Sequence, residues 1–325
     1  MKQSQFERLH QPQWLSFEHL VVLLENGKSR PEASETFAHD YRRLCQHLAL
    51  AQARGYSSHL VDSLQQLALR GHQQLYRRRQ PVGASILVFV LAGFPRLVRQ
   101  QWRFVALAGL LLFGSLLLTG LLVYGFPDLV YSIMAPHQVA QTEAMYDPDQ
   151  SRLGPGGERL ASQDWMMFGY YIMNNIGIAF QTFASGLLLG VGSLFFLLFN
   201  GVMIGAVAGH LTQIGYVQTF WPFVIGHGAF ELTAIALSGA AGLKLGWALV
   251  APGRQRRGQA LREAANIAIQ LVYGVIAMLL IAAFIEAYWS SKTAFSPQAK
   301  YLVGGALWAL VAAYLILAGR QHAPD

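Results

Sequence analysis

Long apolar runs with few charges dominate the sequence after residue 103. A helix needs about 20 mainly apolar residues to cross the hydrocarbon core of a bilayer. Only 13% of the 325 residues are charged, against roughly 25% in an average soluble domain. Soluble enzymes, disordered chains and coiled coils are therefore excluded. The sequence predicts an all-α, polytopic membrane helix bundle of about six transmembrane helices. Two of these helices are expected within 166–210, and one each at 104–125, 221–250, 264–288 and 299–319.

The charges are distributed unevenly along the chain. Residues 1–103 carry 14 Lys or Arg and 7 Asp or Glu, whereas the remainder carries 10 of each. Loop 251–263 has a net charge of +3 and loop 126–165 a net charge of −4. Because loops rich in Lys and Arg stay in the cytoplasm, we expect a bacterial inner (cytoplasmic) membrane protein with both termini in the cytoplasm. The same rule explains the basic excess, so we expect the lipid bilayer, and no nucleic acid, as a partner.

The part of the chain before the first long run divides in two. Residues 1–80 are predicted to form a cytoplasmic helical hairpin domain, because apolar residues recur every three or four positions on both sides of Gly55. Residues 82–94 are apolar but too short to span, and Arg96, Arg99 and Arg103 follow them. We predict that 81–103 form an interfacial amphipathic helix. The alternative is half of a bent first span.

The transmembrane bundle is expected to occupy residues 104–325 and to contain one large extracytoplasmic loop, 126–165. This loop contains Asp147-Pro148, the segment Gly154-Pro155-Gly156-Gly157 and scattered charges. Such a composition favours turns over packed structure.

Polar side chains inside the expected spans carry most of the functional information, because they are costly in a bilayer and need partners. Counted from the expected span ends at about 1.5 Å per residue, five of them lie roughly 8–15 Å deep. His227 and Glu231 are four residues apart and share a helix face. Another carboxylate, Glu286, lies near the outer end of the fifth span. We predict an intramembrane polar cluster of Asn174, Asn175, Asn200, His227 and Glu231.

Two interpretations of this cluster stay open. It is either a structural set of hydrogen bonds that fixes helix register or a site for an ion, proton or substrate. A metal site would need a third ligand, and His210 lies too near the outer end of its span. The single cysteine, Cys45, provides no cysteine-based metal site. Motifs of nucleotide or hydrolytic enzymes are absent from the sequence, so we expect no catalytic residue, no metal, no cofactor and no enzymatic activity.

Small residues recur every four positions in three consecutive spans and allow helix backbones to approach closely. We expect tight packing within one subunit or between two, and a homodimer. The residues expected at these helix contacts are Gly186, Gly190, Gly201, Gly205, Gly209, Gly228, Ser238 and Gly242, with Ala234 continuing the pattern.

Two segments resemble the stage II sporulation protein M family: NNIGIAFQTFASGLLLGVGSLFFLLFNGVMIG, from residue 174, and HGAFELTAIALSGAAGLKLG, from residue 227. The positions that match the family pattern are Asn174, Asn175, Asn200, Gly201, His227, Gly228 and Glu231. The segment YRRLCQHLALAQARGYSSHLVDSLQQLALRGHQQLYR, from residue 41, resembles the cytoplasmic region of the non-sporulating members.

The resemblance implies a membrane component of a complex. The sporulation member works with peptidoglycan-degrading proteins and is not known as an enzyme, and the wider relatives are often encoded near MoxR-type ATPases and von Willebrand factor A proteins. The long N-terminal region departs from the short sporulation member and argues against a sporulation role. We interpret the chain as a non-enzymatic scaffold or assembly component of a membrane or cell-envelope complex, with other membrane or envelope proteins as partners. The alternative is a channel or transporter lined by the polar cluster.

Overall fold

A computed structural model describes residues 1–25, 31–75, 86–149, 153–154, 164–292 and 294–320. Apart from turns, the described residues are helical, and no strand occurs among them. The chain divides into two compact units, Met1–Val82 and Gly83–Asp325.

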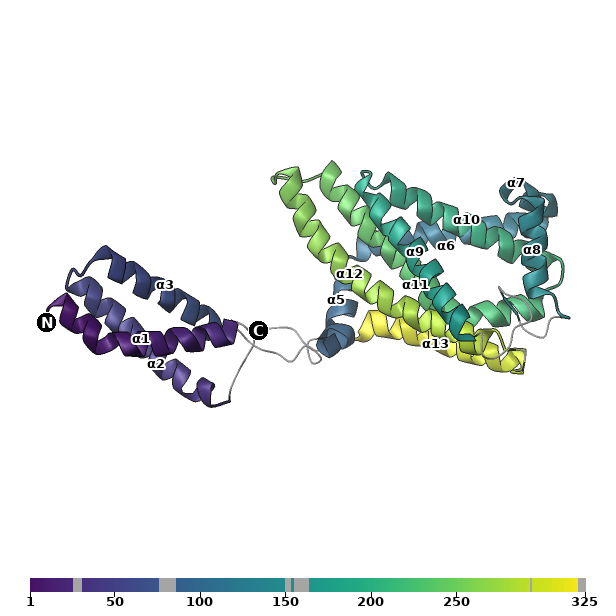
Figure 1. Ribbon diagram of the computed structural model, residues 1–325. Coiled ribbons are helices and arrows are strands. Elements are labelled where there is room, and N and C mark those ends of the chain that lie inside the picture. The colour runs from purple at the N-terminus through teal and green to yellow at the C-terminus, as the bar shows by residue number, and fades with distance from the viewer. Residues whose placement is uncertain (26–30, 76–85, 150–152, 155–163, 293, 321–325) are drawn as a thin grey trace. The chain divides into compact units, whose positions relative to one another are not determined.

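The N-terminal unit contains three helices, α1 (Gln3–Glu25), α2 (Pro31–Ala53) and α3 (Ser58–Leu75) (Figure 1). Apolar residues of all three form one core, in which Phe6 and Phe17 of α1 lie with Leu44 and Leu64. The chain turns between α2 and α3 at Gly55, whose φ of +63° favours glycine. The hairpin expected from the apolar spacing is formed by α2 and α3, and α1 packs against both.

The second unit is a bundle of long helices (Figure 1). Its elements are η1 (Phe89–Gly93), α5 (Phe94–Gln100), α6 (Trp102–Gly125), η2 (Pro127–Leu129), α7 (Val130–Ile133), α8 (Pro136–Tyr146), α9 (Asp164–Ala184), η4 (Ser185–Leu187), α10 (Val191–Gln213), α11 (Val217–Val250), α12 (Arg257–Ile285), η5 (Glu286–Ser290) and α13 (Pro297–Leu317). The helix α11 is the most buried and packs against α6, α9, α10, α12 and α13.

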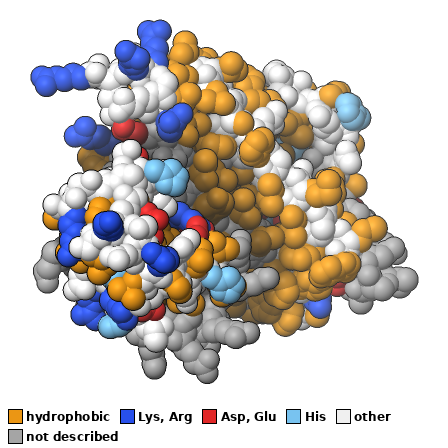
Figure 2. Space-filling view, turned by 60° about the vertical axis from the view of Figure 1, so that its left-hand side comes forward, with side chains coloured by type: hydrophobic (Ala, Val, Ile, Leu, Met, Phe, Trp, Pro, Cys, Tyr) orange, Lys and Arg blue, Asp and Glu red, His pale blue; other side chains and the backbone are white. Residues whose placement is uncertain are grey.

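The predicted all-α membrane bundle is confirmed. Within the described residues, five helices are long and apolar enough to cross a membrane: α6, α10, α11, α12 together with η5, and α13. The other expected span, α9, is less apolar because it carries Asn174, Asn175 and Gln181. Hydrophobic side chains cover a wide part of the visible surface (Figure 2), as expected of a surface that faces lipid.

Small residues bring the helices of the bundle into close contact. The glycines 201, 205 and 209 of α10 lie against the backbone of α6, and a methyl group on any of them would overlap it. Gly186 lies against Gly242, Gly190 lies near Gly246, and the Ser238 hydroxyl donates to the Ala179 carbonyl. Gly228 differs, because a methyl group there would meet only Val224 and Leu232 of its own helix.

The segment Phe89–Gln100 crosses one end of the bundle instead of extending α6 (Figure 1). The chain bends at Gln101, and Phe94, Leu97 and Val98 are buried. Arg99 donates to the carbonyls at the C-terminus of α13, with N–O distances of 2.8 and 2.7 Å. Cations suit this end of a helix dipole. Whether this segment lies at the membrane interface, as predicted for 81–103, or forms half of a bent span stays a prediction, and residues 81–85 lie outside the described part of the chain.

The loop expected at 126–165 contains packed helices, so the expectation of turns is wrong for its first half. Val130, Met134 and Val139 are buried and pack with Val123 of α6 and Ala206 of α10. The composition of the loop was misleading because its Pro and Gly residues lie mostly after α8.

Candidate functional site

A cavity of about 280 Å³ lies between α8, α10, α11 and η5. Its walls are mostly apolar, and its polar side chains gather on α11 and η5. The lining residues are Tyr146, Met203, Ile204, Val207, Phe220, Phe223, Val224, His227, Gly228, Glu231, Leu232 and Glu286.

Three side chains of this cavity carry imidazole or carboxylate groups. His227 and Glu231 lie one turn apart on α11, and Glu286 is the first residue of the π-helical turn η5 at the end of α12. One potential ligand atom from each lies within 4.8 Å of the others. His227 and Glu286 are only 5% and 7% exposed.

The imidazole of His227 is held from the side of η5 and α13. Its Nδ1 atom lies 3.1 Å from the hydroxyl of Ser290. The ammonium group of Lys300, on α13, donates to the Ser290 carbonyl at 2.8 Å. Ser290 thus lies beside one ring nitrogen of His227, and the imidazole also hydrogen-bonds to the backbone of Phe223.

The asparagines of the predicted cluster take different positions. Asn175 is 2% exposed, and its amide faces the Glu231 carboxylate. Asn174 is exposed and donates to Oδ1 of Asn175 at 3.0 Å. Asn200 donates to the Phe196 carbonyl of its own helix at 2.7 Å and does not line the cavity. The structure therefore brings Asn175, His227 and Glu231 together, with Asn174 joined through Asn175, and leaves Asn200 apart.

Glu286 and Tyr146 belong to the site but were not part of the predicted cluster. A carboxylate near the end of an otherwise apolar run was the available signal for Glu286. Nothing in the sequence pointed to Tyr146, because its position depends on the folding of α8 over the bundle. Burial, followed by the nearby carboxylates of Glu286 and Glu231, raises the pKa of the Tyr146 hydroxyl, which therefore stays protonated and can donate.

His210 lies away from this group. Its Nε2 atom is 2.7 Å from the carboxylate of Glu143, and this pair joins α10 to α8. His210 therefore contributes to the packing of the loop helices.

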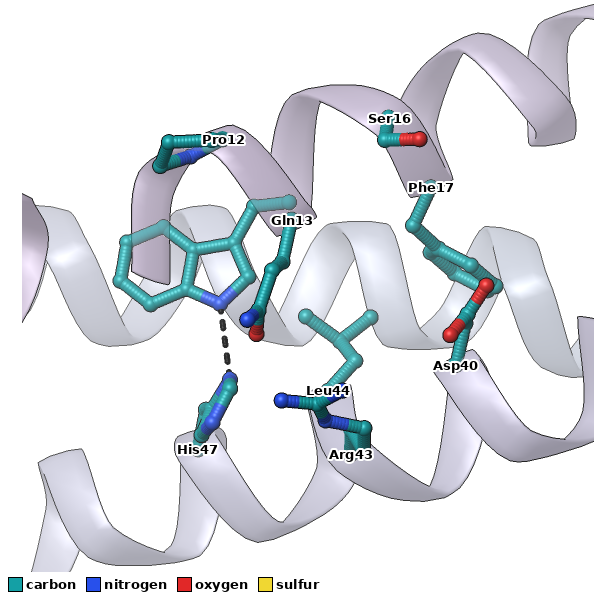
Figure 3. A pocket seen from close by; sticks show the side chains of 9 residues that line it. Pro12, Gln13, Ser16, Phe17, Asp40, Arg43, Leu44 and His47 are labelled. Atoms are coloured by element: carbon teal, nitrogen blue, oxygen red, sulfur yellow. Dashed lines mark hydrogen bonds between the residues drawn. The ribbon is translucent and has the colours of Figure 1, made fainter. Parts of the chain in front are cut away.

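A second pocket, of about 240 Å³, lies in the N-terminal unit between α1 and α2 (Figure 3). The indole nitrogen of Trp14 donates to Nδ1 of His47 at 3.1 Å. Burial lowers the pKa of His47 to about 4, so the imidazole is neutral and accepts this bond. Asp40 and Arg43 line the same pocket. The pocket lies where two helices of the domain core meet, and the packing of these helices against each other explains which residues line it.

The bundle cavity offers cation-binding and proton-exchanging groups inside an apolar environment. A hydroxyl and an imidazole do meet, at Ser290 and His227, as in enzymes that use a serine nucleophile. Ser290, however, is 0% exposed and does not line the cavity. A substrate in the cavity would therefore not reach this hydroxyl in the present conformation.

Comparison with known proteins covers both units of the chain. A family profile described as stage II sporulation protein M matches residues 100–291, and a domain of unknown function (DUF8413) matches residues 4–77. An uncharacterized protein of Methanocaldococcus jannaschii is 28% identical over 130 residues, which are 39% of this chain and 72% of that protein. No solved structure matches the chain. Because the family profile spans more than half of the sequence and includes α6, α9 to α12 and the cavity residues of these helices, the chain belongs to the stage II sporulation protein M family.

Proposed function

We propose that the protein is a non-enzymatic scaffold of a membrane or cell-envelope complex and that it works as a homodimer. Its partners are the lipid bilayer and other membrane or envelope proteins. The observation that carries this proposal is a polar outer face on α9. Asn174 and Gln181 are exposed there beside Met173, which is 79% exposed, and Phe180, which is 60% exposed.

Exposed amides on a membrane helix call for a partner. Asn174 lies ten residues after the start of α9, about 15 Å along the helix axis, and therefore near its middle. Lipid tails offer no hydrogen bonds, so an amide that faces them is costly. Gly177, on the same face, has nothing within 4 Å of the position of a side chain, and a second helix can approach it closely.

A second copy of the chain is the proposed occupant of this face. An asparagine amide contains both a donor and an acceptor, so Asn174 can pair with the same residue across a two-fold axis. The glycines of α10 are already used against α6 within one subunit. The contact between subunits is therefore assigned to α9.

Disulfide crosslinking in native membranes tests the dimer. In a Cys45→Ser background, Asn174→Cys should form an oxidation-dependent dimer. Leu117→Cys is the matched control, since Leu117 of α6 is 61% exposed, and this variant should stay monomeric. Efficient crosslinking of Leu117→Cys together with none at Asn174→Cys would contradict the proposed interface.

We also propose that the protein lies in the bacterial inner membrane with both termini in the cytoplasm. The arginines of loop 251–263 and the acidic residues of 126–149 support this orientation. With Cys45 replaced, an impermeant thiol reagent should label His137→Cys on α8 in intact cells and should not label Arg257→Cys. Labelling of position 257 from outside the cell would contradict the proposed orientation.

Transport is the second candidate function, and the cavity that reaches Glu231 favours it. A transport role requires the charge of Glu231, so Glu231→Gln should abolish function at normal expression. A scaffold needs only the shape and hydrogen bonds, so the same variant should keep the complex intact. Glu231→Leu should destabilise the fold in both cases, because Asn175 loses its polar neighbour, at about 1–3 kcal/mol per unsatisfied group.

A further inference from the structure

We propose that His227, Glu231 and Glu286 bind one divalent transition-metal ion in the bundle cavity. The ion would join α11 to η5. This inference goes beyond the scaffold function and does not depend on it.

The geometry of the three groups is close to that of a metal site. Their potential ligand atoms lie within 4.8 Å of one another. Around a tetrahedral ion with bonds of about 2.0–2.2 Å, ligand atoms lie roughly 3.4 Å apart. Changes in the torsions of the two glutamate side chains would have to close this difference.

The charges of the site also favour a cation. Two carboxylates face each other in a largely buried, low-dielectric region, where like charges repel strongly. A divalent ion neutralises both carboxylates at once. The Asn175 amide and the Tyr146 hydroxyl lie beside them as neutral donors that can orient their oxygens.

The ligand set selects the class of metal. One imidazole nitrogen with two carboxylates suits Zn²⁺, Mn²⁺, Fe²⁺ or Co²⁺, whereas Mg²⁺ and Ca²⁺ prefer oxygen ligands alone. Metal-binding histidines usually have their other ring nitrogen fixed by a hydrogen bond, and Ser290 lies beside Nδ1 of His227 in this way. Three protein ligands leave a further coordination position toward the cavity, where water or a small ligand can bind.

Cobalt is a suitable probe because its ligand-field absorption reports the coordination geometry. The full-length protein, purified in mild detergent with a tag that lacks histidine, is stripped with a chelator and titrated with Co²⁺. We expect visible absorption bands that saturate at one ion per chain. Zn²⁺ should abolish these bands, and the same concentration of Mg²⁺ should not. The absence of such bands in the wild-type protein would overturn the proposal.

Two variants test whether the ion binds at the proposed site. Glu286→Gln should weaken Co²⁺ binding at least tenfold, because an amide is a much poorer ligand than a carboxylate. Glu263→Gln changes the same functional group at the other end of α12, where Gln255 donates to the carboxylate, and should bind one ion like the wild type. Equal binding by Glu286→Gln and the wild type would overturn the site. If Glu286→Gln does not fold, the wild-type titration alone decides.

Discussion

The contact between α10 and α6 makes a sharp prediction about Gly205. A methyl group at this position would lie 3.0 Å from Cα of Leu116 and 3.1 Å from the backbone nitrogen of Gly120, and it would overlap the Leu116 carbonyl. Ordinary contacts need about 3.4–4 Å, and the obstructing atoms belong to backbone. Gly205→Ala must therefore move the helices apart by roughly 0.5–1 Å, and overpacking of this kind typically costs about 1–3 kcal/mol.

Equilibrium unfolding in mixed detergent micelles, followed by circular dichroism, measures this cost. Gly109→Ala on α6 is the matched control, since nothing lies within 4 Å of its added methyl group. The control should be neutral or slightly more stable, because alanine favours helix over glycine. Equal unfolding free energies for Gly205→Ala and Gly109→Ala would refute the close approach of α10 and α6.

At the α5 end of the bundle, Arg99→Ala removes two charged hydrogen bonds and should lower the unfolding free energy by about 1–3 kcal/mol; Arg320→Ala, which loses only a bond within its own segment, should have little effect. In the N-terminal unit, the pKa of His47 falls from its usual 6.5 to about 4 on folding, so below pH 6.5 the unfolded state binds more protons. The contribution of His47 to the unfolding free energy should be fully present above about pH 6.5 and should decline toward pH 4. Hydrogen exchange of the α1 and α2 amides in the full-length protein, corrected for intrinsic rates, should therefore accelerate as the pH falls over this range. Unchanged corrected rates would contradict the buried neutral histidine. Glu143→Ala removes the partner of His210 and should make α8 more sensitive to proteolysis, whereas unaltered cleavage would show that this pair does not hold the helix.

The bundle was largely predictable because its spans are long and apolar. Span length follows from bilayer thickness, and the four-residue spacing of His227 and Glu231 places them on one helix face in any helical fold. The spacing of Gly201, Gly205 and Gly209 likewise predicted a close contact, but not that its partner would be α6.

The remaining features depend on tertiary packing. Glu286 approaches His227 because α12 packs along α11 and ends in a π turn, and no local pattern specifies such a turn. The amide of an asparagine in a helix can bond to a neighbouring helix or to a carbonyl of its own helix. Asn200 bonds to the Phe196 carbonyl of its own helix, which needs no partner helix. The helices α7 and α8 are too short for their periodicity to stand out against the Pro- and Gly-rich segment that follows.

Native mass spectrometry of the intact protein, released gently from its own membranes, tests the proposed homodimer most directly. A homodimer paired through the outer face of α9 predicts a dominant species of twice the mass of one chain, and Asn174→Leu should shift it toward the monomer because the self-complementary amides are lost. A monomer at all protein concentrations, or a dimer that Asn174→Leu leaves unchanged, would contradict the assignment of this face to a second copy of the chain.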